Sequence, residues 1–209
     1  MNWTALYLKT SGLKVFILGT GEVATRRANK FLDHGAIVRL AGNSLDEELS
    51  EKGAVLYSTD EVNNLVEWAD LVVMASGDKQ LSDYVADIAK EKLINRADFP
   101  DKGDIIVPTS FNIGGIEISI FTNGKSPLMA RQLRKRIQSI ITQDDILEIE
   151  LQDYSRSLLK EKIPNQKDRR DYLYKIFEDV EIRELIKTRE MDKAKDVIFE
   201  LIERDFDDT

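Results

Sequence analysis

Short apolar runs alternate with segments of helical spacing over the first hundred residues, and this order constrains the fold more than any other feature of the chain. The apolar runs occupy residues 15–18, 36–40, 54–57, 71–75 and 93–95. Uninterrupted runs such as residues 15–18 and 71–75 are typical of strands that are buried on both faces. The segments with helical spacing between them are residues 23–34, 61–68 and 81–92. We therefore expect an α/β fold, with a parallel sheet covered by helices on both faces.

A glycine-rich turn follows the first run directly. Residues 19–24 read Gly-Thr-Gly-Glu-Val-Ala and fit the pattern G-x-G-x-x-G/A, at the point where a strand passes into a helix. In that setting Gly19 makes the tight turn, Gly21 lets a pyrophosphate approach the backbone, and Ala24 lets helix and strand pack closely. The alternative is an ordinary strand–turn–helix corner, which also favours glycine. We predict a dinucleotide site that consists of Gly19, Thr20, Gly21, Glu22, Val23 and Ala24.

The second strand ends without the acidic residue that commonly binds the adenosine ribose about 20 residues after the turn. The chain there reads Leu-Ala-Gly-Asn-Ser over residues 40–44. Asn43 and Ser44 could still bond to ribose hydroxyls. Arg39 lies within the strand and could point toward a 2′-phosphate or away from it. The residues alone therefore leave the choice between NAD and NADP open.

The pattern changes near residue 105. Residues 105–107 and 116–121 are strand-like, and the sequence Asn-Ile-Gly-Gly at 112–115 is a turn signal, so we expect an antiparallel pair. Ser126 and Pro127 suit the N-cap and the first position of a long helix. From residue 144 onward the chain has a helical and polar pattern that is interrupted near Pro164. We therefore expect a helical segment at the end of the chain.

Asp98 follows the fifth apolar run, in the sequence Asn-Arg-Ala-Asp-Phe-Pro at residues 95–100. This position corresponds to the carboxyl edge of the expected sheet, where open α/β sheets bind their ligands. A carboxylate there could act as a general base. Alternatively, Asp98 caps a turn before Pro100, which is common for aspartate.

A basic cluster lies in the long helix that begins near Ser126. Five Lys and Arg residues fall between Lys125 and Arg136. Ser126 and the N–H groups after it can bind an anion, and Arg131 and Arg134 can bind carboxylates through two hydrogen bonds each. The alternative is a solvated helix face in a dimer contact. If it is a binding site, these residues suit a ligand with several carboxylates.

Charge is distributed unevenly along the chain. The net charge is −8, and residues 141–209 contain 20 acidic and 13 basic residues. Residues 1–140 contain 18 acidic and 17 basic residues and are nearly neutral. This balance argues against a nucleic-acid partner, although a local basic cluster can still bind a small polyanion.

The composition excludes several kinds of site. There is no cysteine, which excludes disulfides, thiolate metal sites and a cysteine nucleophile. His34 is the single histidine, so we expect no His-based metal site and no Ser-His-Asp triad. No apolar run approaches the roughly 20 residues of a membrane-spanning helix. The N-terminus lacks the pattern of a signal peptide. We expect a cytoplasmic protein without a membrane partner.

Four blocks of residues together resemble the precorrin-2 dehydrogenase / sirohydrochlorin ferrochelatase family, which includes the N-terminal part of siroheme synthases. The blocks are residues 6–8 (LYL) with 14–28 (KVFILGTGEVATRRA); 71–75 (LVVMA) with Asp78; 95–100 (NRADFP) leading into 105–108 (IIVP); and 123–127 (NGKSP) with Ala130, Arg131, Leu133 and Arg134. The first block alone is a weak signal. Its combination with the last block is specific.

The resemblance implies a fold and an oligomeric state. Residues 1–110 would form an NAD-binding Rossmann domain, residues 111–147 a small α+β dimerisation segment, and residues 148–209 a helical C-terminal domain. The protein would be a homodimer.

The resemblance also implies a reaction, the NAD-dependent oxidation of precorrin-2 to sirohydrochlorin. The family's key aspartate maps to Asp98, as general base. The cofactor would bind at the glycine-rich turn and at Asn43, Ser44, Ser76 and Asp78. The substrate carries eight carboxylates, and the residues expected to bind it are Asn123, Gly124, Lys125, Ser126, Arg131 and Arg134.

The chain departs from the family pattern at two places. Thr20 stands where many members have the middle of three glycines, and Ser-Gly-Asp at residues 76–78 stands where members commonly have an acidic pair. Two other functions stay open. One is a bifunctional enzyme that also inserts Fe²⁺ into sirohydrochlorin. The other is a non-catalytic NAD-binding partner protein whose acidic last third is an interaction surface.

Overall fold

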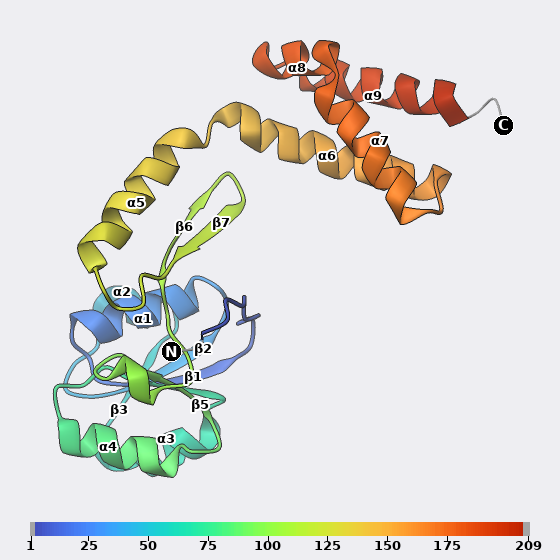
Figure 1. Cartoon of the computed structure of the whole chain (residues 1–209). Coiled ribbons are helices and arrows are strands. Elements are labelled where there is room, and N and C mark those ends of the chain that lie inside the picture. The colour runs from blue at the N-terminus through green and yellow to red at the C-terminus, as the bar shows by residue number, and fades with distance from the viewer. Residues whose placement is uncertain (1–2, 207–209) are drawn as a thin grey trace. The chain divides into compact units, whose positions relative to one another are not determined.

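The chain folds as two compact units that divide between Val107 and Pro108 (Figure 1). The computed structural model describes residues 3–206. The first unit contains a parallel sheet, and the second contains a hairpin and a series of helices. The expected α/β fold with a helical end segment is confirmed.

The sheet of the first unit has five parallel strands in the order β3-β2-β1-β4-β5. The strands are β1 (Lys14–Leu18), β2 (Ile37–Ala41), β3 (Val55–Tyr57), β4 (Leu71–Met74) and β5 (Leu93–Arg96). From β1 the chain adds β2 and β3 on one side, and then returns to place β4 on the other side. This reversal makes the carboxyl ends of β1 and β4 the topological switch point, where sheets of this type bind ligands.

Helices cover both faces of this sheet. Figure 1 shows α1 (Glu22–Leu32) and α2 (Glu47–Glu51) on one face, and α3 (Val62–Trp68) and α4 (Lys79–Ile88) on the other. Side chains of β1 alternate between two buried clusters, because successive residues of a strand point to opposite faces. Val15 and Ile17 pack with α1, whereas Phe16 and Leu18 pack with α3 and α4. Two-sided burial explains the uninterrupted apolar residues of β4 and of β1 after Lys14.

The prediction of a strand at residues 105–107 was wrong. The N–H groups of Asp104 and Ile105 both donate to the carbonyl of Ile94, at 2.8 and 3.0 Å, so the segment only touches the outer edge of β5. Ile105 and Val107 then pack against the buried cluster beneath α1. Pro108 follows and has no N–H to continue a ladder.

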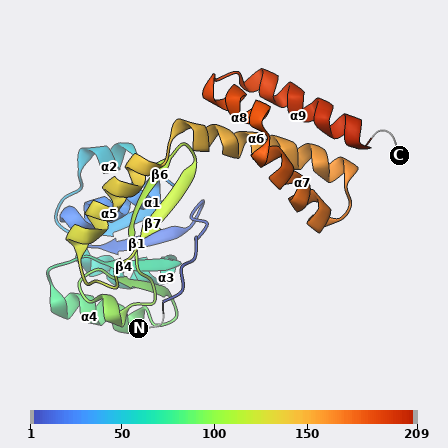
Figure 2. The same ribbon diagram turned by 45° about the horizontal axis from the view of Figure 1, so that its top comes forward.

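The second unit begins with the hairpin of β6 (Thr109–Ile113) and β7 (Ile116–Ile120). Gly114 and Gly115 form its turn, with φ angles of +54° and +91°. The helices that follow are α5 (Pro127–Ile140), α6 (Gln143–Lys162), α7 (Gln166–Glu178), α8 (Val180–Lys187) and α9 (Met191–Phe206) (Figure 2). A buried cluster that includes Leu151, Ile176 and Ile198 joins α6, α7 and α9.

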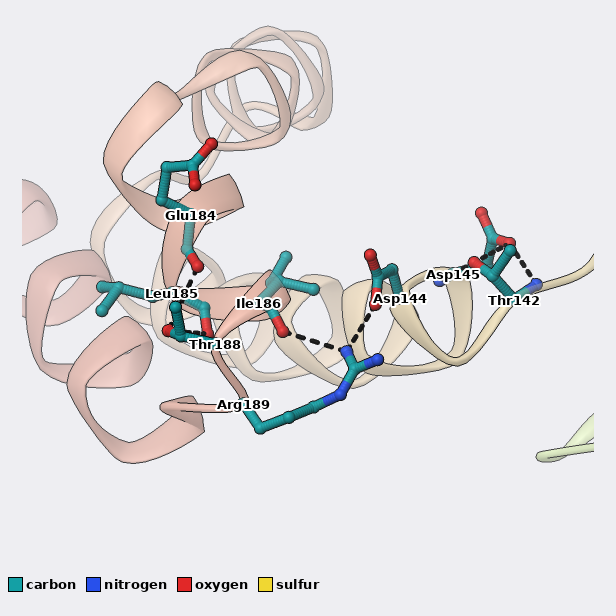
Figure 3. Close-up of polar contacts among 8 residues, drawn as sticks. All are labelled: Thr142, Asp144, Asp145, Glu184, Leu185, Ile186, Thr188 and Arg189. Atoms are coloured by element: carbon teal, nitrogen blue, oxygen red, sulfur yellow. Dashed lines mark hydrogen bonds and ion pairs between the residues drawn. The ribbon is translucent and has the colours of Figure 1, made fainter.

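Arg189 connects the corner between α8 and α9 to the start of α6 (Figure 3). Its backbone is left-handed, with φ +65°, and its N–H donates to the carbonyl of Ile186 at 3.1 Å. The next N–H, of Glu190, donates to Leu185 at 2.9 Å, which completes a Schellman motif. The Arg189 side chain donates from Nη1 to Asp144 Oδ1 at 2.5 Å and to the Ile186 carbonyl at 3.0 Å. One side chain therefore stabilises two helix junctions.

Across residues 3–206, none of the helices is both long and apolar enough to cross a membrane.

Candidate functional site

Gly19 forms the turn that leads from β1 into α1, and its conformation requires glycine. Its φ angle is +113°, which residues with a side chain rarely adopt. Its N–H donates to the carbonyl of Ala41 at 2.8 Å. A Cβ atom at this position would lie 2.5 Å from the carbonyl oxygen of Ala75. The turn therefore passes closely between the ends of β2 and β4, at the switch point of the sheet.

The N-terminus of α1 carries no side-chain cap. Gly21 is its N-cap residue, in an extended conformation, and a Cβ added to it would meet no atom within 4 Å. By contrast, α4 is capped by Asp78 and α5 by Ser126. Uncapped N–H groups at a helix start bind phosphates, and the open space at Gly21 leaves room for one. These residues fit the pyrophosphate of a dinucleotide.

Three other residues of the predicted turn have identifiable surroundings. Thr20 packs against Gly42, where an added Cβ would lie 2.6 Å from Thr20 Cγ2. Glu22 is exposed and lies 3.5 Å from Arg26 Nη1, one helical turn along α1. Ala24 is fully buried in the cluster that holds Val15. Ala24 therefore provides the close packing of helix and strand that the motif predicts.

The residues at the end of β2 include Asn43 and Ser44, which are both exposed. Arg39 lies earlier in this strand, and its guanidinium carbon sits 4.0 Å from the ring centroid of Trp68 and 5.3 Å from that of Tyr57. Such stacking favours a fixed guanidinium position by about 0.5–2 kcal/mol per contact. Arg39 is therefore engaged by two aromatic rings that belong to α3 and β3.

Ser76 and Asp78 follow β4 and order the start of α4. Ser76 Oγ accepts a hydrogen bond from the N–H of Asp78 at 3.1 Å. Asp78 Oδ1 accepts from the N–H of Leu81 at 3.0 Å and so caps the helix. The Asp78 carboxylate thus has a structural role at the same edge of the sheet as Gly19.

Asp98 forms an ion pair with Arg96, the last residue of β5. Arg96 Nε donates to Asp98 Oδ1 at 2.8 Å, and Nη2 donates to Oδ2 at 2.6 Å. Nη2 also donates to Asp83 of α4 at 3.0 Å. Asp98 raises the pKa of Arg96 above its usual value, whereas the hydrogen bond from Arg96 lowers the pKa of Asp83.

Sequence reasoning missed Arg96 and Asp83. The side chain of Arg96 is only 3% exposed, although it is a cation at the end of an apolar strand. A buried guanidinium needs carboxylate partners, because an unpaired charge is costly to bury. The unusual charge next to the buried run was a signal that could have predicted the pair.

The loop that carries Asp98 is anchored against β5. A Cβ at Gly103 would lie 2.9 Å from both the nitrogen of Arg96 and the oxygen of Ile94, so the loop folds back tightly on the strand. Asn95 Nδ2 donates to the carbonyl of Ile105 at 2.7 Å. Arg27 Nη1 donates to the carbonyl of Val107 at 2.9 Å, and burial lowers the pKa of this guanidinium. The segment after Asp98 is thus held against the edge of β5 and against α1.

The predicted substrate-binding residues all lie in the second unit. Ser126 caps α5 by accepting from the N–H of Met129 at 3.1 Å. Asn123 and Gly124 form the turn before it, with φ angles of +53° and +71°. Arg134 lies with its guanidinium carbon 5.4 Å from the ring centroid of Phe111. The exposed cations at this end of the helix include Lys125 and Arg131.

Within the described part of the chain, no three His, Cys, Asp or Glu side chains gather in an arrangement that could hold a metal ion. His34, just after α1, is exposed, and its Nδ1 lies 2.7 Å from the carbonyl of Lys30.

Comparisons with known proteins show which family the chain resembles. A family model described as "Putative NAD(P)-binding" matches residues 6–109. The chain is 34% identical to a "Putative precorrin-2 dehydrogenase" of Methanocaldococcus jannaschii, covering 87% of this chain and 93% of that protein. It is 31% identical to a precorrin-2 dehydrogenase of Methanosarcina barkeri, covering 85% and 84% of the two chains.

Two further likenesses concern a longer protein and a solved structure. A siroheme synthase of Neisseria meningitidis is 27% identical over 99% of this chain, which spans 44% of that protein. A solved structure named SirC, precorrin-2 dehydrogenase, superimposes with a TM-score of 0.73 at 24% identity, covering 93% of this chain and 99% of that one. At this identity the structural likeness supports the fold.

Proposed function

The chain belongs to the precorrin-2 dehydrogenase family of siroheme biosynthesis, and we propose that it oxidises precorrin-2 to sirohydrochlorin with NAD as acceptor. One observation about the site supports this proposed activity. A carboxylate, Asp98, is fixed at the carboxyl end of β5, while the glycine-rich turn and an uncapped helix start lie after β1 of the same parallel sheet. A nucleotide and a proton acceptor at one sheet edge are what a dehydrogenase needs.

NAD, when bound, supplies the acceptor for the hydride. The protein would bind NAD through two groups of residues. Gly21 and the first N–H groups of α1 would bind the pyrophosphate, and Asn43 and Ser44 would bond to the ribose. The stacking of Arg39 on Trp68 supports NAD over NADP, because this guanidinium is already engaged.

Asp98 would accept the proton. The oxidation removes a hydride and a proton from the substrate, so the loss of the hydride to the nicotinamide must be balanced by a base. An ionised carboxylate accepts a proton without rearrangement, and Arg96 provides the counter-charge beside it.

The residues of the second unit would bind the substrate's carboxylates. Arg131 and Lys125 are exposed cations, and the other members of the proposed set are Asn123, Gly124, Ser126 and Arg134. Guanidinium groups pair with carboxylates through two parallel hydrogen bonds, which suits a substrate with many carboxylates. Ser76 and Asp78 complete the set of residues that we propose for the cofactor side.

We also propose a homodimer in which residues 111–147 make the contact between the two copies. In sequence this segment lies between the proposed NAD-binding domain, residues 1–110, and the proposed helical domain, residues 148–209. The exposed apolar residues of α5 support this: the relative exposure of Leu128 is 65% and that of Ile140 is 71%. Sedimentation equilibrium tests the homodimer, and a monomer at micromolar concentration would contradict it.

A cytoplasmic location is a further proposal, which cell fractionation tests.

The experiment for the activity is an anaerobic assay of the purified chain with precorrin-2 and either NAD or NADP. Formation of sirohydrochlorin with stoichiometric reduction of NAD is expected. Binding of NAD without turnover would instead favour a non-catalytic NAD-binding partner protein. Sirohydrochlorin and Fe²⁺, given to the same preparation and compared with the spontaneous rate, test the second activity of metal insertion.

A further inference from the structure

Arg96 is a buried cation between two acidic partners that differ in geometry. Its side chain is 3% exposed, that of Asp98 is 21% exposed, and that of Asp83 is 46% exposed. Asp98 receives two hydrogen bonds from the guanidinium, and Asp83 receives one. Two parallel bonds fix both the position and the plane of a carboxylate, whereas a single bond leaves it free to rotate.

Asp98 lies in a loop, between two regular elements. β5 ends at Arg96, and the next element is the short 3₁₀-helix Pro100–Lys102. Arg96, by contrast, is fixed because the strand positions its backbone and burial restricts its side chain. The rigid part of the pair is therefore the arginine, and the loop aspartate takes its orientation from it.

The pairing still leaves the carboxylate able to react. An ionised carboxylate has about four acceptor positions, and the two bonds from Arg96 occupy one on each oxygen. The remaining positions, and the exposed fifth of the side chain, are accessible to a proton donor.

We infer that Arg96 is a positioning residue for Asp98, which orients the carboxylate for the proton transfer and does not itself touch the substrate. This inference rests on the proposed function, because it gives Arg96 a role only if Asp98 is the base. It goes beyond that function by assigning the orientation of the base to a residue two positions earlier in the chain.

The main test is Arg96→Lys, which keeps the charge but cannot form two parallel bonds. We expect kcat to fall about tenfold or more, because small misplacements of a catalytic group have large effects on rate. We expect the KM for precorrin-2 and the Kd for NAD to change by less than about twofold, since fold and binding are retained. The number of NAD sites per chain should stay the same.

Asp83→Asn is the matched control. It removes a charge from the other side of the same guanidinium, but an amide oxygen can still accept the single bond. Its effect on thermal stability should resemble that of Arg96→Lys, while kcat is retained. An unchanged kcat in Arg96→Lys, or equal losses of kcat in both variants, would overturn the inference.

Asp98→Glu keeps the inference testable if Arg96→Lys does not fold. It leaves Arg96 in place and retains a carboxylate, but it moves that group by one methylene relative to the guanidinium. A large loss of kcat is expected, and a wild-type kcat would overturn the inference. The proposed function is tested separately, because Asp98→Asn with wild-type turnover removes Asp98 from the mechanism whatever Arg96 does.

Discussion

The guanidinium of Arg96 meets the carboxylate of Asp98 side-on, with Nε 2.8 Å from Oδ1 and Nη2 2.6 Å from Oδ2. The two residues are only two positions apart, yet Arg96 ends strand β5 and Asp98 lies in the loop that follows it. The pair thus couples the rigid sheet to the residue that we propose as the base. The pair lies at the carboxyl ends of the parallel strands, and the glycine-rich turn lies at the same edge of the sheet.

Gly19→Ala and Gly21→Ala should have different effects although both change a glycine of one turn. At Gly19 the Cβ would lie 2.5 Å from Ala75 O, and the φ angle is +113°, so we expect a loss of stability of at least about 1–3 kcal/mol. At Gly21 the Cβ has open space, so the fold should survive while NAD binds at least about tenfold more weakly, because the methyl group occupies the path of the pyrophosphate.

Thermal melts and NAD titration of the two variants check this pair. Gly21→Ala with wild-type NAD affinity would contradict the proposed cofactor site.

Arg39→Met should leave the preference for NAD over NADP unchanged. The Arg39 guanidinium stacks on Trp68 and Tyr57, so its removal costs about 0.5–2 kcal/mol of stability per contact but takes no contact from a 2′-phosphate. The measurement is kcat/KM for both cofactors in both proteins. If Arg39→Met selectively lost activity with NADP, the assignment of Arg39 to a structural role would be wrong.

The carboxylate of Asp205 should make the helical unit sensitive to acid. Hydrogen bonds from Lys175 and Tyr172 lower the pKa of Asp205 to about 2. Because an unfolded aspartate titrates near pH 3.9, the unfolded chain binds more protons than the folded one below about pH 4. This contribution to stability is therefore complete above about pH 4 and disappears as the pH falls toward about 2.

Circular dichroism melts of the wild type and of Asp205→Asn, recorded across this pH range, measure the effect. The difference in stability between the two proteins should shrink on acidification. A constant difference would show that the side chain acts through packing and not through its charge.

Two substitutions of Arg189 should separate the effects on stability of its left-handed backbone and of its hydrogen bond to Asp144. Arg189→Ala loses the bond to Asp144 but keeps the left-handed backbone, which costs about 1 kcal/mol or more for any residue with a Cβ. Arg189→Gly also loses the bond but relieves this strain. Because an exposed ion pair is worth about 0–1 kcal/mol, the glycine variant should be close to wild type and more stable than the alanine variant. Chemical denaturation gives the order, and an alanine variant at least as stable as the glycine variant would contradict it.

The sheet was predictable because its strands are buried on both faces, which requires uninterrupted apolar residues such as those of β1 and β4. Residues 105–107 have the same composition for another reason. Ile105 and Val107 pack on the buried cluster beneath α1, and neither joins a strand. An apolar run in the sequence predicts that a segment is buried. Whether the buried segment is a strand depends on the backbone that it hydrogen-bonds to.

The conformation of the glycine-rich turn was predictable, because a backbone such as that of Gly19 dictates the residue type. Asp98 could be singled out from its position after β5, and the cation Arg96 beside it was a signal for their ion pair. The second partner of Arg96 could not be predicted, because Asp83 reaches Arg96 only when α4 packs on the sheet. The stacking of Arg39 on Trp68 likewise depends on tertiary packing between β2 and α3.

Turnover of precorrin-2 by Asp98→Asn is the most direct test of the central claim. The amide is close in shape to the carboxylate and can accept a hydrogen bond from Arg96, but it cannot accept the proton. We predict a folded protein that binds NAD as tightly as the wild type and forms no sirohydrochlorin above the spontaneous rate. A variant that retained the wild-type kcat would contradict the claim that Asp98 is the base of this dehydrogenase.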